Sequence, residues 1–154
     1  MPPAAMSGPA EFAIRAARIE ERDALEALQW RASLALGEYN DELEAHPDAI
    51  QLPIELIERG GVTVAEADGR LAGFAAVILE DDIAELDGLF VEPDLWRQGI
   101  GSALVNVAVH TARMQGLTMM VIANPSARSF YEKCGFVVEG EAKTRFGPAL
   151  RMSR

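Results

Sequence analysis

LDGLFVEPDLWRQGIGSAL, residues 86–104, joins a strand pattern to a helix pattern through a loop that contains two glycines. The loop comprises Arg97, Gln98, Gly99, Ile100, Gly101 and Ser102. Glycines allow backbone N–H groups to approach a ligand closely, and the N-terminus of the helix that follows carries positive dipole charge. Together these features predict a binding site for phosphate oxygens. A tight turn that needs glycine only for its backbone conformation would give the same pattern.

Three nucleotide-binding patterns can be compared with this loop. A Walker A loop requires G-x-x-x-x-G-K-[ST], which the chain does not contain. The dinucleotide fingerprint requires a third small residue where Leu104 stands and an acid about 20 residues later for the ribose, but no acid occurs until Glu132. A pyrophosphate that is bound without a ribose carboxylate remains, and coenzyme A has that chemistry.

The residues on either side of the loop predict a mixed α/β sheet. Period-two and buried-type apolar runs predict strands over residues 12–19, 61–69, 70–81, 83–91, 117–124, 136–144 and 148–154. Helical spacing predicts helices over 19–36, 53–60, 99–115 and 126–135, with a loop and a short helix over 37–53. The helix over 99–115 is expected to bury one face, which consists of Ile100, Ala103, Leu104, Val107 and Thr111.

Length and composition limit the class of protein. The chain has 154 residues, which suits a single domain over 12–154 after a flexible lead-in over 1–11. One cysteine cannot form an intrachain disulfide, and no Cys/His cluster has zinc-site spacing, so no metal is expected. No segment has the pattern of a membrane span or of a signal peptide. A cytoplasmic protein without a membrane partner is therefore expected.

Charge is distributed unevenly along the chain. The formal net charge is −10, which argues against a nucleic-acid partner. Residues 1–92 carry 20 acids and 6 Lys/Arg, a net charge of −14, whereas residues 93–154 carry a net charge of +4. No acid occurs between Leu95 and Tyr131. Such a stretch can accommodate an anion, and buried helix and strand residues would also produce it.

Residues 83–136 resemble the core of the GNAT N-acetyltransferases. The resemblance rests on LDGLFVEPDLWRQGIGSAL and, about 20 residues later, on NPSARSFYEKCGF, residues 124–136. The first resembles the family's strand, Pro-containing loop and R/Q-x-x-G-x-G/A turn, and the second resembles its N-x-x-A-x-x-F/Y-Y-x-K-x-G-F helix. One departure is Trp96, which stands where the family has the first Arg or Gln of the turn.

The resemblance implies an α/β fold and a cofactor. The fold is a mixed, mostly antiparallel central sheet with splayed middle strands and flanking helices, and the co-substrate is acetyl-CoA. The backbone of Leu89, Phe90 and Val91 would pair with the pantetheine arm like an added strand. The turn Arg97–Ser102 would bind the pyrophosphate, and Asn124 would contact the pantetheine.

The family reaction is the attack of a neutral amine on an acetyl thioester. The resemblance places Tyr131 near the thiol of the bound cofactor, where a tyrosine hydroxyl, neutral at about pH 7, can protonate the departing sulfur. Core packing beside Phe130 is the alternative for this residue. Adjacent helix residues point about 100° apart, so one of the two is expected in the core and the other in the cleft.

The general base is the second catalytic position to assign. Some relatives place a glutamate on the strand before Asn124, but LTMMVIA contains no acid, which leaves Glu85 or a water chain. A period of two places Glu85, Asp87 and Leu89 on one face of their strand. The alternative to a catalytic role is that Glu85 and Asp87 are strand residues that simply face solvent. Gly88 within this strand indicates a bulge or the close approach of a ligand.

The expected activity is acetyl transfer to the primary amine of a small molecule, directly within a ternary complex. The alternatives are a protein acetyltransferase that acts on a lysine or N-terminal amine, and a non-catalytic CoA-binding regulatory module. The region that shapes the acceptor site in relatives contains Trp30, Arg31, Tyr39 and His46. The acidic first half favours a cationic acceptor, although acidic surfaces also keep proteins soluble. A homodimer is expected by analogy with the family alone.

Overall fold

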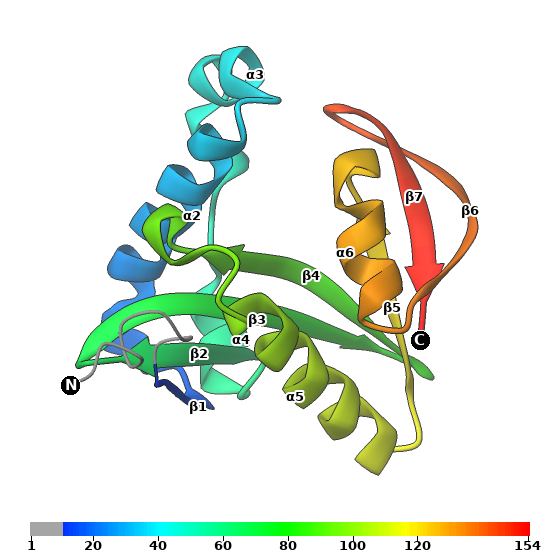
Figure 1. Ribbon diagram of the computed structural model, residues 1–154, viewed down its shortest axis with the longest axis horizontal. Helices are drawn as coiled ribbons and strands as arrows, with labels where there is room; N and C mark the ends of the chain where they lie inside the picture. The colour runs from blue at the N-terminus through cyan, green and yellow to red at the C-terminus, as the bar shows by residue number, and fades with distance from the viewer. Residues whose placement is uncertain (1–10) are drawn as a thin grey trace, which may run out of the picture.

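Seven strands form one sheet in the computed structural model, which describes residues 11–154. Residues 1–10 of the predicted lead-in lie outside the described residues. The strands are β1 (Ala13–Ala16), β2 (Val62–Ala67), β3 (Arg70–Glu80), β4 (Ile83–Val91), β5 (Thr118–Ala123), β6 (Val137–Thr144) and β7 (Gly147–Ser153). Their order in the sheet is β1-β2-β3-β4-β5-β7-β6 (Figure 1). All neighbouring pairs are antiparallel except β4 and β5, which are parallel.

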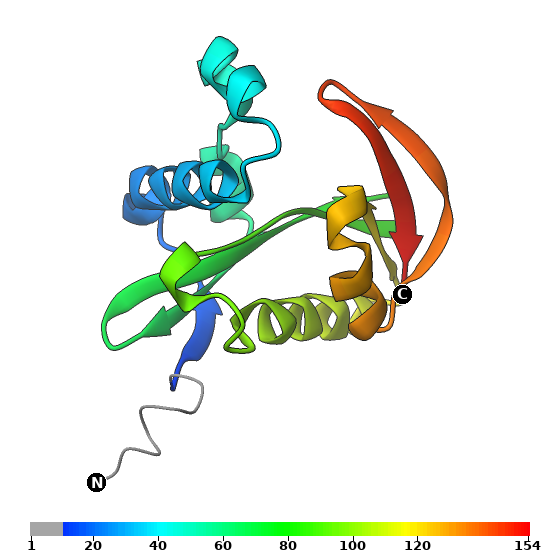
Figure 2. The ribbon, with the colours of Figure 1, turned by 45° about the horizontal axis from the view of Figure 1, so that its top comes forward.

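Helices cover both faces of this sheet. They are α2 (Arg22–Leu36), α3 (Asn40–Ala45), α4 (Ile54–Glu58), α5 (Ile100–Met114) and α6 (Arg128–Lys133). Helix α2 lies on one side of the sheet and α5 on the other, as Figure 2 shows. Within residues 11–154, no helix has the length and hydrophobicity that crossing a membrane requires.

Two buried clusters hold the layers together. The cluster under α2 and α4 includes Leu25, Leu56 and Phe74. The cluster under α5 includes Leu104 and Met119. Each fully buried side chain of this size contributes about 1.5–3 kcal/mol. Because the central strands are covered on both faces, a ligand reaches them where neighbouring strands separate.

Strands β4 and β5 separate in this way. Their parallel register begins at Ile83 and Thr118 and ends at Leu86 and Val121. Beyond that point β4 continues to Val91 in register with β3, while β5 continues in register with β7. The predicted mixed, mostly antiparallel sheet with splayed middle strands and flanking helices is therefore confirmed.

The predicted buried face of the helix over 99–115 is wrong in part. Ile100 and Leu104 are buried as expected, but Val107 and Thr111 are exposed. The other buried residues of α5 are Val105, Ala108, Val109 and Ala112. The buried face is therefore rotated by roughly one residue position, or about 100°, along most of the helix. Apolar residues surround much of α5, so their spacing did not determine which side meets the sheet.

Candidate functional site

A cleft of about 700 Å³ lies at the separated end of β4. Its wall comes from four places: the end of β4, the loop before α5 with the start of that helix, α6 with the segment that leads into it, and the last turns of α2. The predicted site residues that line it are Leu89, Phe90, Val91, Arg97, Gly99, Ile100, Gly101, Ser102 and Tyr131. Most of the wall is apolar and its polar groups are few, which is typical of a small-molecule cleft.

The start of α5 supplies backbone donors to this cleft. Arg97 and Gly99 have φ angles of 66° and 84°, and glycine adopts the second without strain. The helix begins at Ile100, and the Ala103 N–H donates to the Gly99 carbonyl at 3.0 Å. The N–H groups of the preceding residues have no acceptor within the helix. Because the first turn of α5 carries no acid, this end of the helix suits phosphate oxygens.

The end of β4 presents a backbone edge to the cleft. Leu89, Phe90 and Val91 are in register with β3 on one side, and the register with β5 ends before them. The Trp96 indole Nε1 donates a 2.8 Å hydrogen bond to the Val91 carbonyl oxygen. The residue that departs from the family's turn motif thus ties the loop to the strand end. An extended ligand with amide groups can pair with the rest of this edge as an added strand.

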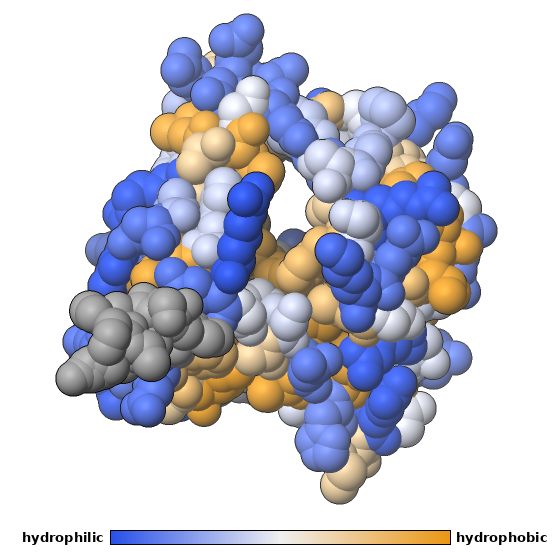
Figure 3. Space-filling view, viewed as in Figure 1, coloured by the Kyte–Doolittle hydropathy of each residue, from blue (hydrophilic) through white to orange (hydrophobic). Residues whose placement is uncertain are grey.

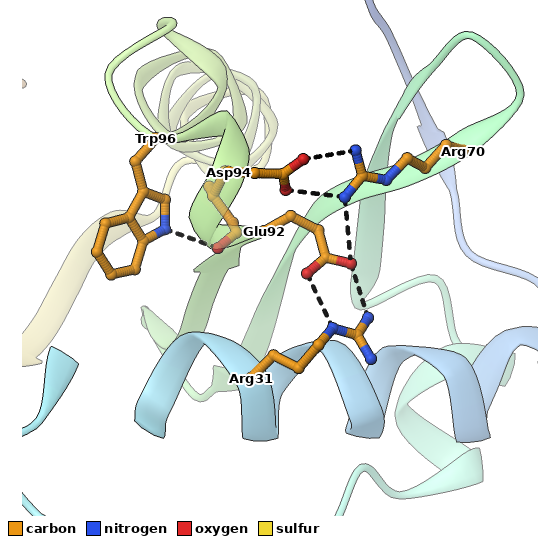
Figure 4. Close-up of polar contacts among 6 residues, drawn as sticks. Arg31, Arg70, Glu92, Asp94 and Trp96 are labelled. Atoms are coloured by element: carbon orange, nitrogen blue, oxygen red, sulfur yellow. Dashed lines mark hydrogen bonds and ion pairs between the residues drawn. The ribbon is translucent and has the colours of Figure 1, made fainter. Parts of the chain in front are cut away.

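A charged network fixes the segment between β4 and α5. The Glu92 carboxylate, whose side chain is 9% exposed, accepts two hydrogen bonds from the Arg31 guanidinium, at 3.0 and 2.7 Å. Arg70 donates two hydrogen bonds to Asp94, at 3.0 and 2.8 Å. Figure 4 shows the two guanidinium groups on either side of Glu92, with Arg31 on α2 and Arg70 on β3. Because Ala32 lines the cleft, the network joins the α2 wall of the cleft to the segment that leads from β4 to α5.

Tyr131 belongs both to the cleft wall and to the buried core. It is 8% exposed, and its ring packs edge-on against Phe130 and Phe136, with centroids 5.0 and 5.4 Å away. Burial raises the pKa of Tyr131, and its hydroxyl is protonated at neutral pH with or without this shift. Phe130 also lines the cleft. The expectation that only one of the two aromatic residues would do so is therefore wrong, because α6 presents its edge to the cleft.

Glu85 lies on the α2 side of the sheet and outside the cleft wall. Its partner in β3 is Ile78, which packs against the cluster under α2 and α4. Asp87 is an extra residue in the β4 register, next to Gly88, so the indicated bulge is present. Beyond the bulge, Leu89 packs against the cluster under α5. The predicted common face of Glu85, Asp87 and Leu89 is therefore wrong, because the bulge reverses the alternation of side chains.

The surroundings of Glu85 raise the pKa of its carboxyl group. Burial raises the pKa of this carboxyl group, and the negative charges of Asp87 and Glu80 raise it further. Partial desolvation also raises the pKa of Asp87. A carboxylate with a raised pKa accepts a proton more readily near neutral pH, which is the property a general base needs.

Two other predicted contacts, Asn124 and Gln98, lie outside the cleft wall. The Asn124 Oδ1 accepts a hydrogen bond from the Ser126 N–H at 3.2 Å, and Ser126 lines the cleft. The Asn124 Nδ2 donates a hydrogen bond to the Glu38 carboxylate. Gln98 lies in the loop between two residues that line the cleft. Contact of either side chain with a cofactor stays a prediction.

The cleft wall also includes residues that were not predicted as contacts. They are Ala32, Leu36, Leu95, Trp96, Ser126, Ala127 and Phe130. Ser126, Ala127 and Phe130 belong to the second motif, so the motif itself was a signal for them. No local pattern marks Ala32 and Leu36, because α2 reaches the cleft only through tertiary packing.

Comparisons with known proteins agree with the two motifs. The family model for the acetyltransferase (GNAT) family matches residues 23–136. The peptidyl-lysine N-acetyltransferase YjaB of Salmonella typhimurium is 34% identical over 138 residues, which cover 84% of this chain and 86% of that protein. An uncharacterised N-acetyltransferase of Methanocaldococcus jannaschii is 32% identical over 90 residues, which cover 51% of this chain and 40% of that protein.

A solved structure shares the fold. The PaiA N-acetyltransferase from Thermoplasma acidophilum, in complex with coenzyme A, matches with a TM-score of 0.78 and 22% identity, covering 94% of this chain and 98% of that one. The chain spans about half the length of sequence relatives such as the Methanocaldococcus protein and a probable N-acetyltransferase of Mycobacterium tuberculosis. Since the family model covers most of the sequence, including both motifs, the chain belongs to the GNAT family of acetyltransferases.

Proposed function

We propose that this chain is an acetyl-CoA-dependent N-acetyltransferase that moves an acetyl group to the primary amine of a small molecule, directly within a ternary complex. The observation that carries the proposal is the cleft of about 700 Å³ in which the start of α5, the edge of β4 and Tyr131 meet. These three features suit, in order, the diphosphate, the amide groups and the thioester of a single ligand.

The residues present fit coenzyme A. The backbone N–H groups at the start of α5 suit its phosphates, and the edge of β4 offers partners for its amide groups. Leu95 and Phe130 provide apolar contacts for its methylene groups. The fold is also that of a protein solved with coenzyme A bound. Among residues 11–154, no group of three His, Cys, Asp or Glu side chains is arranged to hold a metal ion.

The chemistry requires one proton donor and one proton acceptor. Bound acetyl-CoA supplies a thioester, on which the lone pair of a neutral amine forms the new C–N bond as the C–S bond breaks and the sulfur departs with its electron pair. Tyr131, whose hydroxyl is protonated at neutral pH as in any tyrosine, gives its proton to the sulfur. Because Glu85 lies outside the cleft wall, it takes the proton from the amine through a water molecule, and its raised pKa favours this step.

Two other functions have specific support. YjaB, which aligns with most of this chain, is a peptidyl-lysine N-acetyltransferase, which favours a protein acceptor. Strand β5 reads TMMVIA and carries no acid, which gives some weight to a non-catalytic CoA-binding module. A cytoplasmic location and a homodimer stay predictions.

Calorimetric titration with acetyl-CoA, beside NAD and ATP, tests the cofactor. Selective binding, together with thiol release in the presence of small amines, would support the proposed activity. Faster release with a lysine peptide would favour the protein acceptor, and binding without release would favour the non-catalytic module. A folded sample that does not bind acetyl-CoA would contradict all three.

A further inference from the structure

The end of β4 directs only some of its backbone groups towards the cleft. The Glu92 N–H, directly after the strand, donates to a carbonyl oxygen of β3 at 2.8 Å. In an antiparallel pair, alternate residues bond the same neighbouring strand, so Phe90 also turns its N–H and C=O towards β3. A Cβ at Gly73 of β3 would lie 2.8 Å from the Phe90 carbonyl oxygen, which agrees with this direction. Leu89 and Val91 therefore turn theirs to the other side, where the register with β5 has ended.

Trp96 occupies one of these backbone groups. Its indole Nε1 donates to the Val91 carbonyl oxygen at 2.8 Å, a bond that is dashed in Figure 4. Trp96 also lines the cleft, so the indole stands on the cleft side of that carbonyl. Figure 3 shows the surface hollowed between the α2 side and the α6 side of the molecule, above β4. With the Val91 carbonyl engaged, the edge still offers the Leu89 N–H and C=O and the Val91 N–H to a ligand.

A ligand that pairs with a strand edge can slip along it. The outward N–H and C=O groups repeat every second residue, a shift of about 7 Å, so neighbouring registers offer the same hydrogen bonds. At the end of β4, the Val91 carbonyl is the next acceptor after that of Leu89, and the Trp96 indole already bonds to it. An amide N–H of a ligand therefore finds its acceptor at Leu89 and not one repeat nearer the loop.

The segment that carries Trp96 is fixed by charged pairs. Arg31 donates two hydrogen bonds to Glu92, and Arg70 donates two to Asp94. Hydrogen bonds between charged groups are stronger than those between neutral groups. Both acids lie just before Trp96 in the chain, so these bonds hold the backbone from which the indole reaches the strand end. This arrangement favours an indole that keeps its place over one that swings away when a ligand enters.

We propose that Trp96 is a positioning residue that fixes the register of the pantetheine arm of the cofactor on β4. Its indole stays bonded to the Val91 carbonyl and leaves the Leu89 carbonyl as the acceptor for an amide N–H of the arm. This inference rests on the proposed function, because the arm belongs to the proposed cofactor. Register matters to the reaction, since a slip of one repeat would carry the thioester about 7 Å along β4, whereas reacting atoms must lie about 3–3.5 Å apart.

Two substitutions separate the hydrogen bond of Trp96 from its ring. Trp96→Phe keeps an aromatic ring and loses the donor, whereas Trp96→Gln keeps an N–H donor at the same number of bonds from Cβ and loses the ring. Trp96→Phe is expected to lower kcat about tenfold or more, because the arm is then free to slip, while the dissociation constant of acetyl-CoA changes little. Trp96→Gln is expected to retain more of the wild-type kcat than Trp96→Phe. Thiol release with the small amine that the wild-type protein acetylates fastest measures kcat, and calorimetry measures the dissociation constant.

The indole N–H gives a readout that does not depend on turnover. The chain contains two tryptophans, Trp30 and Trp96, so the proton–nitrogen correlation NMR spectrum has two indole signals. Trp96→Phe assigns them, because it removes one of the two. Exchange of the Trp96 indole proton with solvent is expected to be no faster with bound acetyl-CoA than without it, because the hydrogen bond to Val91 is kept.

Faster exchange of this proton in the complex would overturn the proposal, since it would show that the ligand displaces the indole. Tighter acetyl-CoA binding by Trp96→Phe would overturn it for the same reason. An unchanged kcat in Trp96→Phe, or a larger loss of kcat in Trp96→Gln than in Trp96→Phe, would show that the hydrogen bond does not set the register. A wild-type protein that does not bind acetyl-CoA, or that binds it without acetylating any amine, would instead contradict the proposed function, so the two failures are distinguishable.

Discussion

Tyr131 combines two roles that are usually separate. Its ring belongs to the core, where it packs against Phe130 and Phe136, and its side chain also reaches the cleft wall. Packing on two aromatic rings restricts the position of the hydroxyl group, which like any tyrosine hydroxyl is protonated at neutral pH. A general acid requires both a defined position and a bound proton.

Tyr131→Phe tests this assignment with little change in packing. The variant keeps both ring contacts and loses only the hydroxyl group, so kcat is expected to fall about 10²-fold or more. The dissociation constant of acetyl-CoA is expected to change little. Thiol-release kinetics and calorimetry measure the two quantities. An unchanged kcat would remove Tyr131 from the mechanism.

The pH profile of kcat/KM reports on Glu85. A base works only when it is deprotonated, so activity is expected to fall as the pH drops through the raised pKa of Glu85. Asp87→Asn removes one of the charges that raise this pKa, so the acidic limb of the profile is expected to move to lower pH. If the acidic limb of the pH profile does not move in Asp87→Asn and persists in Glu85→Gln, the general base is another group.

At the scale of one element, the loop before α5 shows how local sequence creates a binding surface. Gly99 takes a φ of 84° immediately before the helix begins at Ile100. Gly101 leaves room between the helix and α6, because a Cβ there would lie 3.3 Å from the Phe130 ring. Both glycines thus keep side-chain atoms away from the backbone N–H groups at the start of α5, which are proposed to meet the phosphates of the cofactor.

Gly101→Val is expected to weaken acetyl-CoA binding about tenfold or more, which corresponds to about 1.4 kcal/mol. The valine would crowd Phe130 and Val91, both of which line the cleft. Gly140→Ala is the matched control, because a Cβ at Gly140 meets no atom within 4 Å. Calorimetry measures both variants. Equal affinities for acetyl-CoA would show that the loop is only a structural turn.

At the scale of the whole molecule, the cleft depends on how separate elements are held together. Arg31 on α2 binds Glu92, which directly follows β4. The Tyr39 ring, which follows α2 in the chain, stacks on Phe146 in the turn between β6 and β7, with ring centroids 5.7 Å apart. The ion pair fixes α2 relative to the end of β4. Without Arg31, the buried Glu92 carboxylate would have no opposite charge to offset the free-energy cost of its removal from water.

Arg31→Ala is expected to lower the free energy of unfolding by about 1–3 kcal/mol, because it leaves the buried Glu92 carboxylate without its two hydrogen bonds. Arg70→Ala is the comparison, since the contact between Arg70 and Asp94 is exposed and its loss should matter less. Urea denaturation measures both variants. Equal losses of unfolding free energy in the two variants would show that the buried pair of Arg31 and Glu92 stabilises the protein no more than the exposed pair of Arg70 and Asp94.

Much of the fold and part of the site could be predicted from local patterns. The strand over 83–91 matches β4, and the glycines of the loop mark the start of α5 because positive φ angles and close approach require them. The bulge at Asp87 was indicated by Gly88, but its consequence for the direction of Leu89 was not. The buried face of α5 was also misassigned, because an apolar helix does not reveal which side packs against the sheet.

Turn chemistry and hydrophobic period are local properties, so the order of the elements and the two-glycine loop before α5 are encoded in short segments of this chain. The separation of β4 from β5, the approach of Leu36 to the cleft and the stacking of Tyr39 on Phe146 involve segments that are distant in the sequence. Such contacts depend on which surfaces pack together once both faces of the sheet are covered. The loop and the strand end that are proposed to hold the cofactor could therefore be recognised from the motifs, whereas the α2 side of the cleft takes its shape only in the folded molecule, because it depends on contacts between distant segments.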